Sequence, residues 1–173
     1  MRRLTRRQRR AVAVVVAMVA AAAVVVARSR ACFRRGWSVT SGTVRRVSDG
    51  DSFTLTNGER VRLLEIDAPE MTGERAELAL RSRAALINLI GGKVVRLEPG
   101  PRLRDKYDRA LAYVFVESEG GAAEVFVNAE VVRAGLARAK TWGPAGKRWD
   151  AVLAAETDAR EAGRGMWSPS TSP

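Results

Sequence analysis

Residues 52–63, with the sequence SFTLTNGERVRL, decide the fold. Apolar residues alternate with polar ones on both sides of Asn57-Gly58, the dipeptide most typical of a tight β-hairpin turn. The alternation gives both segments one apolar face, which includes Phe53 before the turn and Val61 after it. The pattern therefore predicts two antiparallel strands at the beginning of a β-meander.

Further strands are predicted on both sides of this hairpin. Val44 and Val47 indicate a strand before it, and Lys93–Glu98 and Leu111–Glu117 predict two strands after it. Because the segment Leu111–Glu117 is apolar on both faces, we expect it to lie at the centre of the sheet. With the hairpin, these segments give about five strands.

Three helices are predicted between and after the strands. The first runs from Glu74 to Ile90, ends at Gly91-Gly92 and carries an apolar stripe of Ala76, Leu80, Ala84 and Ile87. A short helix follows Asn128 and ends near Gly135, and a last helix runs from about Lys147 to Ala162. We therefore expect an α+β fold, mainly β, in which a small closed barrel is capped by about three helices.

The net charge of +11 is concentrated in the first 35 residues. They hold ten arginines and no acidic residue, so residues 36–173 carry 20 basic and 19 acidic residues. The folded part is nearly neutral, and bulk charge gives no argument for nucleic-acid binding. Cys32 is the sole cysteine, which excludes an internal disulfide.

Residues 11–27 form an unbroken apolar run of alanine, valine and one methionine. Such a run, with arginines on both sides, predicts a transmembrane anchor with a cytoplasmic N-terminus and an external domain. The alternatives are a secretory signal cleaved after Ala27, which would give a secreted protein, and a buried soluble helix. The expected organisation is a basic n-region (1–10), the apolar segment (11–27), a basic linker (28–38), one domain (39–168) and a disordered tail (169–173).

The chain contains no histidine, so imidazole bases and ligands are excluded. Carboxylates and arginines occur instead at predicted strand ends. Asp51 begins one strand of the hairpin, and Asp67 follows the other. Two carboxylates, a backbone carbonyl and water suit a hard cation such as calcium. Arg62 and Arg109 could add an anion clamp beside it.

Four segments together resemble the staphylococcal nuclease (thermonuclease) family. They are Asp49-Gly50-Asp51, Arg62–Glu70, Asp105–Tyr113, and Val127-Asn128 with Gly135-Leu136-Ala137. The order and spacing are compatible with that family over residues 39–168, which implies an oligonucleotide-binding (OB-fold) barrel of five strands with three helices. The resemblance also implies endonucleolytic hydrolysis of DNA and RNA that leaves 3′-phosphates.

The resemblance assigns roles by position. Arg62, Glu70 and Arg109 would be catalytic, and Asp51, Asp67 and the backbone carbonyl of Ala68 would bind Ca²⁺. Glu70 would deprotonate the attacking water. Substrate contacts are assigned to Lys106, Tyr107 and Leu111.

Three departures from the family pattern stand out. Asp108 replaces a glycine beside Arg109, and the segment after Glu70 is too short for a lysine-rich loop. The stacking tyrosines after Ala137 are absent, and Trp142 is expected to stack on a base in their place.

The expected function is a calcium-dependent, membrane-anchored or secreted nuclease acting as a monomer on DNA and RNA. The alternative is a catalytically weak OB-fold module that binds nucleic acid or a protein partner. A degenerate copy would be expected to lose some of the two arginines, the glutamate and the two aspartates, whereas this chain keeps all five. An oligosaccharide-binding barrel is allowed by fold but has no motif in its favour.

Overall fold

The computed structural model describes residues 40–72, 76–118, 121 and 123–169. The chain divides into two compact units, Met1–Ser38 and Val39–Pro173, and every described residue belongs to the second. The predicted transmembrane or signal segment, residues 11–27, lies outside the described residues, as do the basic linker and most of the C-terminal tail. Within the described part, every helix is too short or too polar to span a bilayer.

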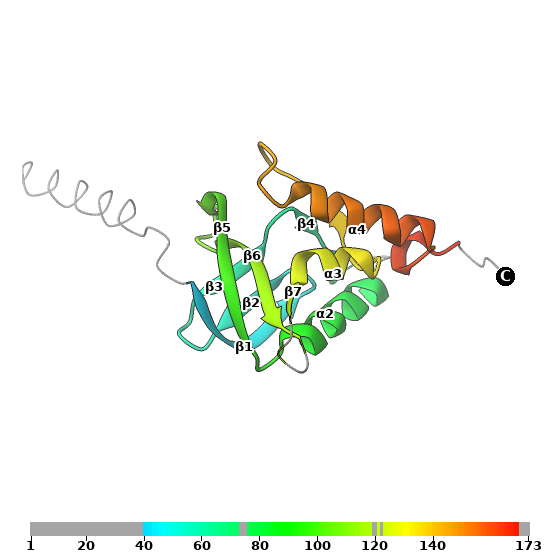
Figure 1. Cartoon of the computed structure of the whole chain (residues 1–173). Coiled ribbons are helices and arrows are strands. Elements are labelled where there is room, and N and C mark those ends of the chain that lie inside the picture. The colour runs from blue at the N-terminus through cyan, green and yellow to red at the C-terminus, as the bar shows by residue number, and fades with distance from the viewer. Residues whose placement is uncertain (1–39, 73–75, 119–120, 122, 170–173) are drawn as a thin grey trace, which may run out of the picture. The chain divides into compact units, whose positions relative to one another are not determined.

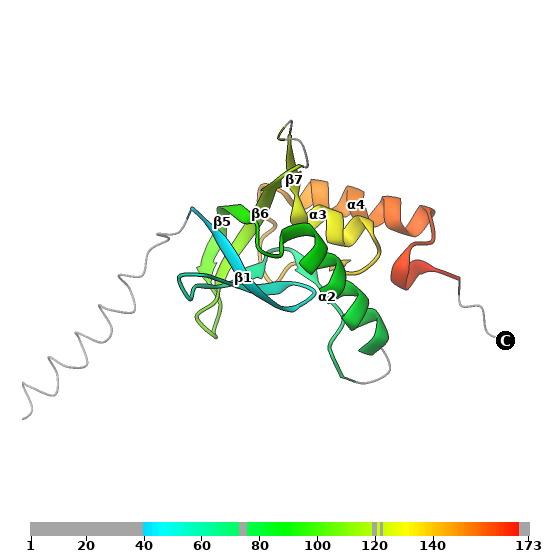
Figure 2. The same cartoon turned by 90° about the horizontal axis from the view of Figure 1, so that it is seen from below.

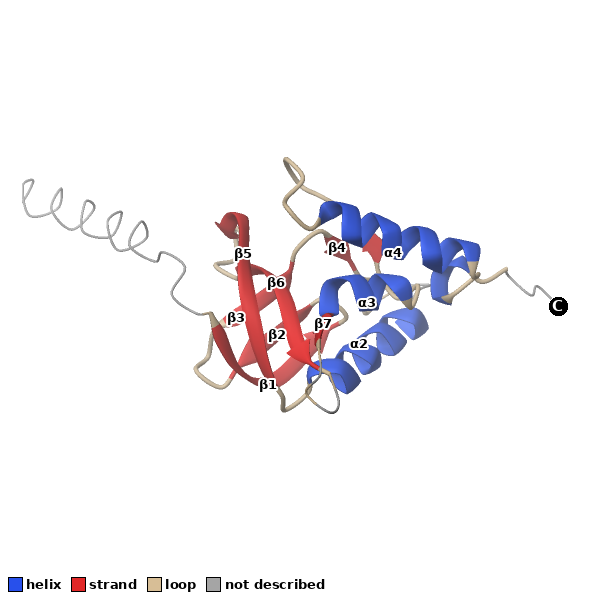
Figure 3. Cartoon of the chain, viewed as in Figure 1, coloured by secondary structure: helices blue, strands red, loops and turns tan. Residues whose placement is uncertain are grey.

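The second unit mixes strands and helices (Figure 3). In chain order the elements are β1 (Ser41–Asp49), β2 (Ser52–Leu55), β3 (Arg60–Leu63), β4 (Ile66–Asp67), α2 (Ala76–Ile90), β5 (Val94–Arg104), β6 (Ala110–Glu117), β7 (Glu124–Phe126), α3 (Val127–Arg133), β8 (Arg138–Ala139), α4 (Trp149–Glu161) and the 3₁₀ helix η1 (Gly165–Trp167).

Five strands close into a ring. The six-stranded sheet has the order β3-β2-β1-β5-β6-β7, and an additional parallel pairing between β3 and β6 joins its two sides. In that pairing Arg62 lies opposite Leu111. The predicted hairpin is confirmed, because β2 and β3 pair antiparallel with Phe53 opposite Val61. The predicted mixed fold, mainly of strands with three α-helices, is likewise confirmed over the described residues.

The core follows from the alternation of apolar residues in these strands. Phe53, Val61 and Leu63 are at most 1% exposed, and burying each contributes roughly 1.5–3 kcal/mol. Strand β6 is buried on both faces from Ala112 to Val116, and it pairs with β3, β5 and β7. The prediction that this strand is central is therefore confirmed.

The three α-helices gather on one side of the ring, as Figures 1 and 2 both show. Helix α3 packs on α4, α2 and β6, whereas α2 packs on β1. The predicted apolar stripe of α2 is wrong: Leu80 is 54% and Ile87 41% exposed, while the opposite stripe that includes Ala79 and Leu86 is buried. Both stripes have helical spacing, and the tight turn before β2 packs against α2 at Ser82, which belongs to the buried stripe.

That turn contains Gly50, which approaches α2 closely. A Cβ at Gly50 would lie 1.9 Å from Ser82 Oγ and 2.8 Å from Ala68 Cβ. Neither neighbour could tolerate this contact, so a glycine is required here. The contact also places Asp51 next to the segment that follows β4.

Three features of the strands differ from the prediction. Strand β5 continues past Glu98 to Arg104, and its pairing with β6 is irregular between Pro99 and Arg104. Proline is tolerated in a strand at such an irregularity. Strand β7 was not expected, and neither was the short pair β4–β8, in which Asp67 lies opposite Arg138. These short pairs involve too few residues to produce an alternation in the sequence.

Candidate active site

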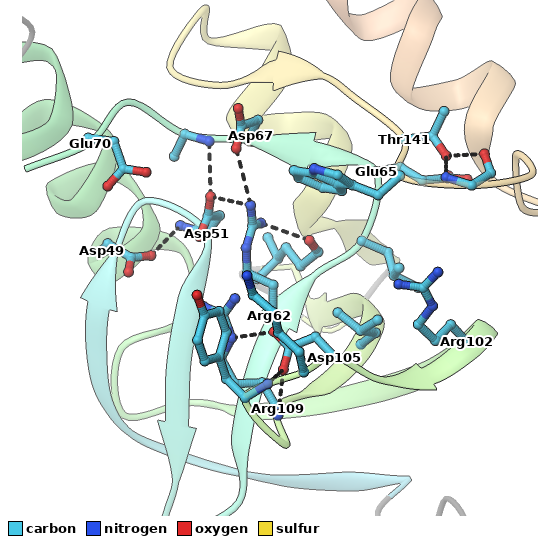
Figure 4. A pocket seen from close by; sticks show the side chains of 18 of the residues that line it. Asp49, Asp51, Arg62, Glu65, Asp67, Glu70, Arg102, Asp105, Arg109 and Thr141 are labelled. Carbon is cyan, nitrogen blue, oxygen red and sulfur yellow. Dashed lines mark hydrogen bonds and ion pairs between the residues drawn. The ribbon is translucent and has the colours of Figure 1, made fainter.

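One pocket of about 970 Å³ brings together all ten residues that the sequence analysis singled out. Its lining includes Asp51, Arg62, Asp67, Ala68, Glu70, Lys106, Tyr107, Arg109, Leu111 and Trp142. Strands β1, β3, β4, β5 and β6 supply part of the lining, and the connecting segments, including those after β4, β5 and β8, supply the rest (Figure 4). Four segments that are distant in the sequence therefore share one cavity.

Asp51 lies at the centre of the polar contacts. Its side chain is 9% exposed, and its Oδ2 accepts a hydrogen bond from the Ala68 amide at 2.9 Å. Asp49 shapes the turn before it, because Asp49 Oδ1 accepts from the Asp51 amide at 3.1 Å. Burial raises the pKa of Asp51 to about 7, although the positive charge of Arg62 lowers it. The carboxyl group of Asp51 is thus largely withdrawn from solvent.

Arg62 faces the pocket but is itself buried. Its guanidinium lies 2.9 Å from Asp51 Oδ2 and 3.4 Å from Asp67 Oδ1. The backbone carbonyls of Leu63 and Ile66 each accept a hydrogen bond from its Nη1 at 3.0 Å. These partners fix the guanidinium in one orientation, so that it presents a preorganised positive charge.

Arg109 is held from two sides. Its Nε donates to Asp105 Oδ2 at 2.7 Å, and its Nη1 donates to Ser52 Oγ at 3.2 Å. Burial raises the pKa of Asp105, but the hydrogen bonds from Arg109 and Tyr107 outweigh it and hold this pKa below its usual range. Ser52 in turn donates to Asp51 Oδ1 at 2.9 Å. A single hydrogen-bonded chain therefore connects the two arginines through Ser52 and Asp51.

Four of the remaining predicted residues are exposed, namely Glu70, Lys106, Tyr107 and Trp142, whereas Leu111 in β6 is partly buried. Glu70 is exposed, and within the described part of the chain its carboxylate makes no hydrogen bond or ion pair that would occupy it. Tyr107 is 58% exposed, with the Lys106 ammonium 4.9 Å and the Arg109 guanidinium 5.4 Å from its ring centre. Trp142 is 53% exposed, and its ring lies 5.3 Å from the Arg62 guanidinium. Exposed aromatic rings beside cationic side chains can stack on bases.

Asp108 pairs with Arg104, whose Nε lies 3.7 Å from Asp108 Oδ1. Its φ of 60° is the left-handed conformation that glycine adopts without strain. Arg109 has Asp105 as a carboxylate partner.

The oxygen atoms that the predicted metal ligands offer are of the type that a hard cation prefers. Asp51, Asp67 and the Ala68 carbonyl offer only oxygen, which calcium and magnesium prefer. The Lys140 ammonium lies 2.8 Å from Asp67 Oδ2, so a bound cation would compete with this lysine for the Asp67 carboxylate. The described residues include no group of three or more acidic side chains close enough to hold a metal by themselves. Water or substrate oxygens would have to complete the coordination.

Sequence reasoning missed four residues of the pocket and its surroundings. Ser52 and Asp105 position Arg109, Lys140 pairs with Asp67, and Glu65 lines the wall. Asp105 could have been found from its position four residues before Arg109. The other three depend on pairings between distant segments, and no local pattern indicates them.

Comparisons with known proteins agree with this geometry. Residues 60–169 match the family model described as "Staphylococcal nuclease homologue". The chain is 32% identical to the thermonuclease of Staphylococcus intermedius, a match that covers 72% of this chain and 74% of that protein. It is 34% identical to an uncharacterized endonuclease of Haemophilus influenzae, covering 71% of this chain and 64% of that protein. It is 28% identical to the thermonuclease of Staphylococcus hyicus, covering 71% and 73%. This chain therefore belongs to the family of staphylococcal nuclease homologues.

Proposed function

We propose that this protein is a calcium-dependent endonuclease that hydrolyses phosphodiester bonds of DNA and RNA. The main support is the hydrogen-bonded chain that fixes Arg62 and Arg109 in the pocket that also contains the exposed carboxylate of Glu70. Two fixed guanidinium groups beside a free carboxylate match the charge pattern of phosphodiester hydrolysis. Relatives named thermonuclease and endonuclease support the same reaction.

In the proposed reaction Glu70 accepts a proton from a water molecule, whose oxygen forms a bond to phosphorus. The bond from phosphorus to the 5′ oxygen breaks, and this oxygen receives a proton. The products are a 3′-phosphate and a 5′-hydroxyl. Arg62 and Arg109 stabilise the negative charge that builds up on the phosphate oxygens, and one of them assists the leaving oxygen.

Asp51, Asp67 and the Ala68 carbonyl would hold the calcium ion. When bound, the ion would position the phosphate and neutralise part of its charge. Tyr107 and Trp142 would contact bases of a single strand through their exposed rings, and Lys106 would contact phosphate. This arrangement favours unpaired nucleic acid, because a base must leave its stack to reach a ring face.

The proposed function also includes the fold, the oligomeric state and the location of the enzyme. We propose that the five-stranded ring is an OB-fold barrel and that the protein acts as a monomer. We also propose that residues 11–27 anchor it in the cytoplasmic membrane, with the nuclease outside, or that they are cleaved and the enzyme is secreted. An external site suits calcium, which extracellular modules bind at roughly 10⁻⁴ to 10⁻³ M.

The test is digestion of single-stranded DNA, duplex DNA and RNA by the purified protein, with calcium or with a chelator. Glu70→Ala serves as the catalytic control. We expect cleavage only in the wild-type lanes with calcium. Equal cleavage in all lanes would contradict the mechanism. Binding of oligonucleotide without any cleavage would instead favour the catalytically weak binding module.

A further inference from the structure

A loop of residues 140–146 forms one wall of the pocket. It follows β8 and precedes α4, and Thr141, Trp142, Gly143 and Pro144 in this loop line the cavity. We call it the Trp142 loop. Because Trp142 extends from this loop toward Arg62, the position of its ring depends on how the two ends of the loop are fixed.

A single residue, Glu65, contacts both ends. Its backbone carbonyl accepts a hydrogen bond from the Lys140 amide at 2.9 Å. Its side-chain Oε1 accepts one from the Gly146 amide at 2.5 Å. Glu65 lies between β3 and β4, directly after the strand that carries Arg62. The Trp142 loop is therefore fixed at both ends to the backbone segment that positions the buried arginine.

The conformation of Glu65 is costly. Its φ of 61° is in the left-handed region, which glycine adopts without strain and a glutamate rarely does. The side chain is buried, with only 4% of the residue exposed, and its Oε2 has no hydrogen-bond partner in the described part of the chain. A strained and buried acidic residue is retained where the surrounding structure uses it.

The contact with Gly146 is also close. A Cβ at Gly146 would lie 2.0 Å from the Tyr113 hydroxyl and 3.1 Å from Glu65 Oε1. Burial and the neighbouring negative charge of Glu65 raise the pKa of Tyr113 to about 12, so the phenol stays neutral beside the carboxyl group. The end of the Trp142 loop thus rests on a buried surface made by Glu65 and Tyr113.

We propose that Glu65 is a positioning residue that fixes the Trp142 loop and thereby places the Trp142 ring against an unpaired base of the substrate. The part about substrate rests on the proposed function. The part about the loop does not, and it can be tested without any activity.

The first experiment measures amide hydrogen exchange in Glu65→Leu, Glu65→Gln and the exposed control Glu77→Leu. Glu65→Leu removes the acceptor of the Gly146 amide, and we expect this amide to exchange at least about tenfold faster while the amides of β6 keep their protection. Glu65→Gln keeps an oxygen acceptor and should retain wild-type protection. Unchanged exchange at Gly146 in Glu65→Leu would overturn the proposal.

The second experiment measures kcat and KM on single-stranded DNA. We expect Glu65→Leu and Trp142→Ala each to raise KM about tenfold with a small change in kcat, and Glu65→Leu to add nothing in the Trp142→Ala background. An equal additional rise in that background would show that Glu65 does not act through Trp142. If the wild-type protein cleaves no substrate, the proposed function fails, and the exchange experiment still decides the role of Glu65 in the loop.

Gly146→Ala is a second variant for the case in which Glu65→Leu does not fold. It leaves Glu65 in place but forces the loop away from Tyr113 and Glu65. We expect the same rise in KM and the same loss of protection in residues 141–146. Wild-type KM together with wild-type exchange in Gly146→Ala would contradict the proposal.

Discussion

At the scale of single residues, the site depends on Asp51 more than on any other group. This buried carboxyl group accepts from Ser52 and from the Ala68 amide, and it pairs with Arg62. Ser52 extends the chain of contacts to Arg109. The two arginines are therefore coupled, and removal of the Ser52 hydroxyl should affect how both guanidinium groups are held.

Ser52→Ala removes the hydroxyl that connects Asp51 with Arg109. A hydrogen bond to a charged group contributes about 1.5–3 kcal/mol, and about 1.4 kcal/mol corresponds to a tenfold change in rate. We expect kcat for single-stranded DNA to fall by about tenfold or more, and the free energy of unfolding to fall by about 1.5–3 kcal/mol because the same hydrogen bond is lost from the folded state. Ser41→Ala, at an exposed position of β1, is the matched control. Equal kcat in Ser52→Ala and the control would show that the connection is not used.

At the scale of secondary-structure elements, two side chains join the helices to the ring. Asn128 in α3 is fully buried; its Oδ1 accepts from the Val114 amide, and its Nδ2 donates to the Leu64 carbonyl. Glu98 in β5 pairs with Lys147 and Arg148, which precede α4. Both contacts support the segments that surround the pocket.

Asn128→Ala should strongly destabilise the fold. It leaves the buried Val114 amide and Leu64 carbonyl without their side-chain partner, and each unsatisfied group costs about 1–3 kcal/mol. We expect a loss of about 3 kcal/mol or more in the free energy of unfolding, measured by urea denaturation. Asn88→Ala, at an exposed position of α2, should change this free energy by less than about 0.5 kcal/mol. Similar losses in the two variants would refute the role of Asn128.

The lowered pKa of Glu98 predicts that the fold loses stability in acid. Partial burial raises the pKa of Glu98, but hydrogen bonds from Lys147, Arg96 and Arg148 outweigh it and lower this pKa to about 2. The folded-state pKa lies below the unfolded value of roughly 4.3, so the stabilisation is present above that value and is lost as the pH falls toward 2.

Urea denaturation of wild type and Glu98→Gln at several pH values measures this effect. We expect the wild-type midpoint to be higher at pH 7 and the difference between the two proteins to shrink steadily between about pH 4.5 and 2. A constant difference over this range would show that the Glu98 carboxylate does not contribute through its ion pairs.

At the scale of the whole molecule, ring closure assembles the site. The parallel pairing of β3 with β6 sets Arg62 opposite Leu111, two residues after Arg109. The hairpin and the central strand could be predicted, since alternation and continuous apolarity are local patterns. The β3–β6 pairing, the buried face of α2 and the left-handed Glu65 depend on contacts between distant segments, so no local pattern indicated them. The ten site residues could be named because the sequence resembles a family with a known site.

We propose that Glu70 is the general base of a phosphodiesterase site. The most direct test is the single-turnover cleavage rate of single-stranded DNA by wild type and Glu70→Gln at saturating enzyme and calcium. General-base catalysis contributes about 10²–10⁴-fold, so we predict a rate at least about a hundredfold lower in Glu70→Gln, with unchanged oligonucleotide affinity and unfolding midpoint. Equal cleavage rates in the two proteins would contradict a general-base role for Glu70.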